Sequence, residues 1–70
     1  MDKQKIGKKL RELRGDITVL ELSKALGVST SAISMYEIGE RVPRDEVKLK
    51  YAKHFGKSVE EIFFADKVHD

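Results

Sequence analysis

The chain has 70 residues, a formal net charge of +2 and no cysteine. This length suits one domain, close to the smallest size at which an apolar core alone makes a fold stable. The lack of cysteine excludes stabilising disulfides. The two scattered histidines, His54 and His69, do not predict a metal site. No apolar run approaches the roughly 18 residues that a membrane span needs, and the basic N-terminus lacks the apolar stretch of a signal peptide. We therefore expect a soluble, cytoplasmic protein that is stabilised by apolar packing and binds no cofactor.

Positive charge is concentrated in two parts of the chain. Residues 1–15 and residues 47–57 each carry a net charge of +4, whereas residues 16–46 and 58–70 each carry −3. Such clusters can contact phosphates on either side of a helix that enters a nucleic-acid groove. They are equally compatible with ordinary solvated helix faces, so charge alone leaves both interpretations open.

Apolar residues recur at helical spacing, and no stretch alternates with the period of two that half-buried strands show. Two capping boxes, Thr18 with Glu21 and Ser58 with Glu61, mark helix starts. Glycines mark the helix ends, and Pro43 reads as an early helical position. The expected helices cover residues 3–14, 18–26, 29–37, 43–55 and 58–63.

The core is expected to be built from the apolar face of each helix. Five of the nine residues from 47 to 55 are apolar, so not all of them can face one way. The expected class is all-α, with one domain over residues 1–65 and a short frayed tail over residues 66–70. The candidate core residues are Ile6, Leu10, Leu13, Leu22, Leu26, Val28, Ile33, Tyr36, Val47, Leu49, Tyr51, Ala52, Phe55, Val59, Ile62 and Phe63.

The stretch from Thr18 to Glu37 reads as two short helices joined by a glycine turn, a unit that can place a helix in the major groove. The pattern ITxxELxxxLGVSxSxISxYExGxRxP resembles the lambda-repressor-like helix-turn-helix family of bacteria and phages, also described as Cro/repressor or xenobiotic-response-element-type. The likeness extends from IGKKLRELR near the start to FGKSVEEIF near the end.

The resemblance implies a compact five-helix domain whose second and third helices form the helix-turn-helix. It also implies a bacterial or phage-encoded, sequence-specific regulator, typically a repressor, that binds double-stranded DNA as a homodimer on a near-palindromic operator. Neither a membrane nor a small-molecule substrate is expected as a partner. An enzyme is not expected, because the sequence contains no nucleophile–base set, phosphate-binding loop or cluster of metal ligands.

In that family the N-terminal half of the helix over residues 29–37 projects into the major groove. Packing through Ile33 and Tyr36 would expose the other side of this helix. Ordinary helix-start chemistry also explains its hydroxyl residues, and a methionine can equally fill a gap at an interface. The candidate base contacts are Thr30, Ser31, Ser34 and Met35, and the candidate phosphate contacts are Ser29, Arg41, Arg44, Lys8 and Lys9.

The resemblance also pairs Arg14, near the end of the first helix, with Glu37 at the end of the third. A buried pair would fix the angle between these helices, and loss of one partner would then cost roughly 3–5 kcal/mol. The alternative is a solvated surface pair worth less than about 1 kcal/mol.

Three apolar residues depart from the family pattern. Val19 replaces a glutamine that starts the second helix, Leu20 follows it, and Ile38 replaces a common asparagine. If all three are exposed, they form an apolar patch that suits a protein-interaction module, such as an antitoxin or the partner of an anti-repressor. The alternative is that Leu20 packs under the short loop between the first two helices.

The proposed reading helix contains no Arg, Lys, Asn or Gln, so it cannot make bidentate contacts to guanine or adenine. Either specificity then depends on DNA shape and deformability, or part of this surface binds a protein partner. Near the end of the chain, Ile62, Phe63 and Phe64 are consecutive, and one helix cannot bury all three in its own core. Phe63 and Phe64 are therefore the candidate dimer contacts, although Phe64 can instead fold back onto the first helix.

Overall fold

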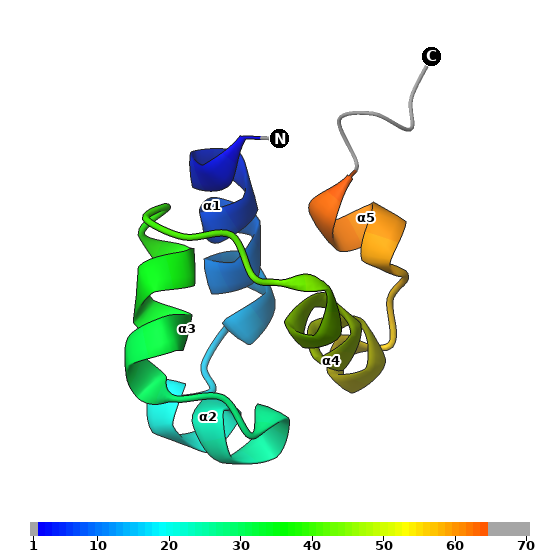
Figure 1. Cartoon of the computed structure of the whole chain (residues 1–70). Helices are drawn as coiled ribbons and strands as arrows, with labels where there is room; N and C mark the ends of the chain where they lie inside the picture. The colour runs from blue at the N-terminus through cyan, green and yellow to red at the C-terminus, as the bar shows by residue number, and fades with distance from the viewer. Residues whose placement is uncertain (1, 65–70) are drawn as a thin grey trace.

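The computed structural model describes residues 2–64, and these residues form five helices and no strand (Figure 1). The predicted all-α class is confirmed. Among the described residues, no helix combines the length and apolar character that crossing a membrane requires. The helices are α1 (Lys3–Arg14), α2 (Val19–Leu26), α3 (Thr30–Glu37), α4 (Asp45–Phe55) and α5 (Val59–Phe63).

Both predicted capping boxes are present. The Glu21 N–H donates to the Thr18 hydroxyl over 3.0 Å, and the Thr18 N–H donates to the Glu21 carboxylate over 2.9 Å. Ser58 and Glu61 make the same reciprocal pair at 3.0 and 2.8 Å. The bond that the Glu61 carboxylate accepts from the Ser58 N–H lowers the pKa of Glu61, because it favours the charged form. Each box satisfies two backbone N–H groups that a helix start would otherwise leave free, so α2 and α5 begin where the sequence predicts.

The predicted start of the fourth helix is wrong. Pro43 lies in the loop before α4, which begins at Asp45 after Arg44 as the N-cap residue. Arg44 is in an extended conformation with ψ of 169°, so the chain is not yet helical at Pro43. The proline ring is instead fully buried. Pro43 therefore anchors the loop between α3 and α4 in the core rather than starting a helix.

The core is centred on Tyr51, whose side chain is completely buried. Ring centroids of Tyr36, Phe55 and Phe63 lie 6.4, 6.2 and 6.2 Å from that of Tyr51. Such aromatic contacts add stabilisation beyond area burial. The buried apolar residues are Ile6, Leu10, Leu22, Leu26, Ile33, Tyr36, Val47, Tyr51, Ala52, Ile62 and Phe63.

Two expectations about apolar residues are corrected by this core. Leu49 is 62% exposed and takes no part in it, because the buried face of α4 is formed by Val47, Tyr51 and Ala52. Phe63, a candidate dimer contact, is buried against Tyr51 within its own chain. Only its neighbour Phe64 remains partly exposed. The predicted tail over residues 66–70 lies outside the described residues.

Candidate functional site

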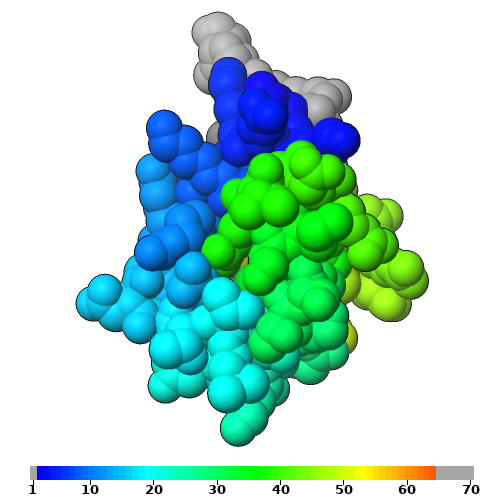
Figure 2. Space-filling view, turned by 90° about the vertical axis from the view of Figure 1, so that its left-hand side faces the viewer, coloured from blue at the N-terminus to red at the C-terminus, as the bar shows by residue number. Residues whose placement is uncertain are grey.

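The helix α3 presents one face to the core and the other to solvent. Ile33 and Tyr36 are buried. Figure 2 shows α3, in green, in the middle of one face of the molecule, with α1 and α2 in blue and cyan on one side and the following loop in yellow-green on the other. This face therefore offers a protruding helix between flanking elements. The four candidate base contacts all lie exposed on α3: Thr30, Ser31, Ser34 and Met35.

The turn before α3 is built from small residues and one left-handed glycine. Gly27 has φ of 68° and ψ of 34°, a conformation that costs a residue with a Cβ roughly 1–2 kcal/mol. The Ser23 hydroxyl donates to the Val28 carbonyl over 2.6 Å and ties the turn to α2. The Ser29 hydroxyl accepts from the Ala32 N–H over 3.1 Å and caps α3. The helix start is thereby fixed relative to α2, and the first N–H groups of a helix have no partner within the helix itself.

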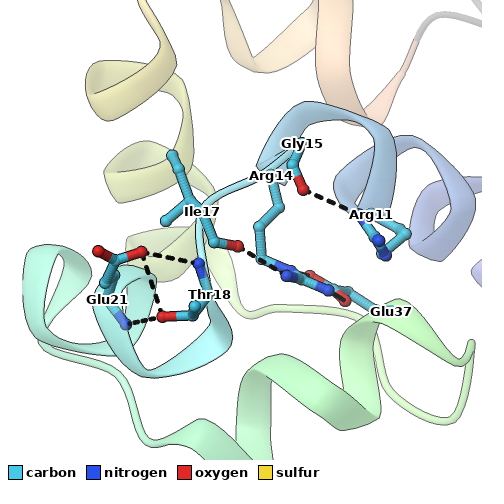
Figure 3. Close-up of polar contacts among 7 residues, drawn as sticks. All are labelled: Arg11, Arg14, Gly15, Ile17, Thr18, Glu21 and Glu37. Atoms are coloured by element: carbon cyan, nitrogen blue, oxygen red, sulfur yellow. Dashed lines mark hydrogen bonds and ion pairs between the residues drawn. The ribbon is translucent and has the colours of Figure 1, made fainter.

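Arg14 and Glu37 join α1 to α3 through a bidentate ion pair. The Arg14 Nε and Nη2 groups donate to the two Glu37 carboxylate oxygens over 2.8 and 3.0 Å. The Nη1 group donates to the Ile17 carbonyl over 2.7 Å, so one guanidinium holds three segments together (Figure 3). The side chains are only 13% and 8% exposed. Because Glu37 hydrogen-bonds and attracts the guanidinium, the pKa of Arg14 is raised above its ordinary value.

A glycine sets the distance between α1 and α3. A Cβ atom on Gly7 would lie 2.5 Å from the Tyr36 carbonyl oxygen and 2.6 Å from that of Glu37. These are backbone atoms of α3, so no side-chain rotation can relieve the contact. Sequence reasoning missed this role. The available signal was an isolated glycine inside a helical pattern, which often marks a close approach of two backbones.

The candidate phosphate contacts lie on the elements that flank α3. Lys8 is exposed on α1, and the half-buried Lys9 lies near enough to Glu61 of α5 to act on its charge. Ser29 caps α3, Arg41 lies in the loop after α3, and Arg44 caps α4; all three are exposed. The basic candidates therefore lie on elements before and after α3 in the chain. Basic side chains that reach phosphates fix the register of a docked helix on the duplex.

Exposed apolar side chains also occur around α3. Leu20 is 57% exposed and Ile38 is 65% exposed, whereas Val19 is half-buried against the core. The alternative that Leu20 packs under the preceding loop is therefore wrong. Two residues correspond to about 200° around a helix, so the burial of Leu22 turns Leu20 outward.

Lys48 is the one charged residue that the described part of the chain buries, and sequence reasoning missed it. Its Nζ atom lies 5.0 Å from the Phe64 ring centroid, 5.8 Å from that of Phe63 and 3.7 Å from an Asp45 carboxylate oxygen. A cation over aromatic faces is attracted by their quadrupoles. Phe64 therefore packs against α4 through Lys48. In the sequence Phe64 simply follows Phe63, and no pattern there indicates the contact of Phe64 with Lys48.

Comparison with known families identifies the same region. A family model described as helix-turn-helix, HTH_3, matches residues 8–62. The matched range contains α2 and α3 complete, together with Arg14 and Glu37. Comparisons with curated proteins and with solved structures gave no match.

Proposed function

The chain belongs to the Cro/C1-type helix-turn-helix family of DNA-binding transcription regulators, and on this premise we propose that it is a sequence-specific regulator, acting as a repressor. In this proposal α3 enters the major groove of a near-palindromic operator. Two copies bind as a homodimer, so that their α3 helices read half-sites about one helical turn apart.

The observation that carries the proposal is the orientation of α3. Ile33 and Tyr36 hold it against the core, and the Arg14–Glu37 pair fixes its far end. Its opposite side is exposed and carries only short or flexible side chains. Short side chains allow the helix backbone to approach the floor of the groove closely. A rigidly held helix with a free outer face is what major-groove docking requires.

Base recognition is assigned to the exposed residues of α3. Serine and threonine hydroxyls both donate and accept, so they discriminate bases weakly, whereas the Thr30 methyl group can pack on a thymine methyl. Met35 offers a second apolar contact of this kind. Because these contacts are modest, DNA shape and deformability contribute much of the specificity. Register on the duplex comes from Ser29, Arg41, Arg44, Lys8 and Lys9 at phosphates.

Selection of bound sequences from a random duplex pool tests this function directly. We expect a two-fold symmetric consensus containing thymine opposite Thr30. The variant Thr30→Val keeps the methyl group and should retain the thymine preference, whereas Thr30→Ser loses the methyl group and should relax it. Failure of the wild-type protein to enrich any sequence, or to bind any duplex at low salt, would contradict the proposal.

Phosphate contacts are tested by salt dependence. Arg41→Gln or Arg44→Gln should weaken binding to all sequences and reduce the slope of log affinity against log salt by about 1. Lys57→Gln is the matched control, because Lys57 is exposed in the loop between α4 and α5. Figure 1 shows this loop on the opposite side of the molecule from α3. Unchanged slopes for both arginine variants would remove these residues from the interface.

A second candidate function is a protein-interaction module on the same fold, such as an antitoxin or the partner of an anti-repressor. The observation that favours it is the exposure of Leu20 and Ile38. Leu20→Ser and Ile38→Ser should leave the selected DNA sequence unchanged if these residues bind a protein partner. Loss of the sequence preference in these variants would instead assign both side chains to DNA.

A further inference from the structure

The outer face of α4 has an exposed leucine that neither the core nor the α3 surface uses. Leu49 borders a groove of about 390 Å³ between α4 and α5. Half-buried Val59 and Phe64 provide further apolar surface there. Contiguous exposed apolar surface, rather than a single exposed leucine, is a feature of interaction sites, and Leu49, Val59 and Phe64 lie together along this groove.

Charged residues flank Leu49 in a particular order. Asp45 lies four residues before it and Lys53 four residues after it, and both are exposed. Residues four apart lie on the same side of a helix. Asp45, Leu49 and Lys53 therefore present a negative, an apolar and a positive side chain in that order along α4, beside the exposed Glu46 and Lys50. Asp45 and Lys53 are eight residues apart, which corresponds to roughly 12 Å along the axis. They therefore cannot pair with each other within one chain.

When two copies of this helix lie antiparallel, the negative end of each one faces the positive end of the other. We propose that the α4 face formed by Asp45, Leu49 and Lys53 binds the same face of a second copy, with the two α4 helices antiparallel about a two-fold axis at Leu49. Each Asp45 then faces Lys53 of the other copy, and the two Leu49 side chains meet at the axis. Such an isologous contact closes at two subunits.

The proposed interface agrees with the position of α3 and rests on the homodimer of the proposed function. In Figure 2 the yellow-green residues that lead into α4 form the edge beside the face on which α3 is exposed. The proposed interface uses residues of α4, so the exposed residues of α3 are not part of it. Phe64, predicted as a dimer contact, lines the same groove and lies at the margin of the proposed interface.

Charge reversal in separate chains tests the proposal. Asp45→Lys gives a chain with two positive residues on this face, and Lys53→Asp gives one with two negative residues. We expect each variant alone to self-associate at least tenfold more weakly than the wild type in sedimentation equilibrium at chain concentrations up to about 1 mM. A 1:1 mixture should form a heterodimer, because both cross-chain pairs are then of opposite charge.

Controls with the same charge changes on other elements are Glu12→Lys on α1 and Lys24→Asp on α2, both at exposed positions. Their mixture should behave as the wild type does. Leu49→Gln is a third variant that leaves charge unchanged and affects an exposed position, so it should fold normally and lose self-association. Circular dichroism checks that every variant is folded.

A wild-type chain that stays monomeric, single variants that dimerise as the wild type does, or a mixture that stays monomeric would each overturn this interface. Binding to a duplex with one half-site, measured in parallel, reports on the proposed function separately. If that binding fails while the heterodimer forms, DNA recognition is refuted and the interface remains. If it succeeds while no heterodimer forms, the interface alone is refuted.

Discussion

Replacement of Gly7 by alanine tests how closely α1 and α3 are packed. The added Cβ would meet two α3 carbonyl oxygens at 2.5 and 2.6 Å, so the helices must separate. Overpacking of this kind costs about 1–3 kcal/mol, whereas alanine gains at most about 1 kcal/mol over glycine in a helix interior. Because the Cβ would meet backbone atoms, the cost lies in the upper part of this range, at about 2–3 kcal/mol, and the net destabilisation is expected to be about 1–2 kcal/mol.

The assay is thermal and urea unfolding followed by circular dichroism. For a domain of this size, 1 kcal/mol corresponds to about 4–8 °C in melting temperature, so the melting temperature of Gly7→Ala should fall by about 5–15 °C. DNA affinity, measured where both proteins are fully folded, should fall as well, because α3 is displaced from Arg14.

Gly56→Ala is the matched control for the loss of a glycine. Its Cβ would meet no atom of the described residues within 4 Å, but its φ of 65° makes alanine unfavourable there by about 1–2 kcal/mol. It should lower stability and leave DNA affinity unchanged. A Gly7→Ala protein as stable as the wild type would refute the reasoning, since α1 and α3 would then have room for the methyl group.

Three further substitutions test the Arg14–Glu37 ion pair, the centre of the core and one helix start. Glu37→Gln should lower the free energy of unfolding by about 3 kcal/mol, because it leaves a largely buried Arg14 without its charged partner; a loss below about 1 kcal/mol in urea titration would show an ordinary surface pair. Tyr51→Phe should raise stability by about 1 kcal/mol, because the Tyr51 hydroxyl is buried without a hydrogen-bond partner among the described residues. Burial raises the pKa of Tyr51 above its usual value near 10. Above about pH 10 the unfolded state therefore loses the hydroxyl proton before the folded state does, and the wild type loses stability. The Tyr51→Phe variant should lose less stability over this pH range, and equal losses for the two proteins would contradict this. Thr18→Ala removes the acceptor for the Glu21 N–H and should cost about 1 kcal/mol, and an unchanged urea midpoint would show that the capping box contributes little.

Some features of the fold depend only on residues close together in the sequence. The two capping boxes join residues three apart, and the left-handed conformation of Gly27 depends on its own backbone. These starts and ends were therefore predictable without knowledge of the tertiary contacts. The outward side of α3 was also predictable, because the burial of Ile33 and Tyr36 determines which residues face away from the core.

Other features depend on neighbours that the sequence does not place. Pro43 is suited to the first turn of a helix, but the core holds it in an extended loop before α4. Phe63 and Phe64 are adjacent residues of the same type, yet it is the Phe63 ring that contacts Tyr51. Lys48 is buried because α5 brings two aromatic rings to its Nζ atom.

The packing of α1 against α3 shows most clearly which features depend on the sequence alone and which depend on tertiary structure. The pairing of Arg14 with Glu37 was expected from the family resemblance, whereas the contact of Gly7 with the end of α3 was not. Local hydrogen bonding and helical periodicity determined the helices and the exposed face of α3 from the sequence alone. The distance and angle at which α3 is held were decided by tertiary structure. They result from atoms of α1 and α3 that are 23 to 30 residues apart in the chain and meet only after packing.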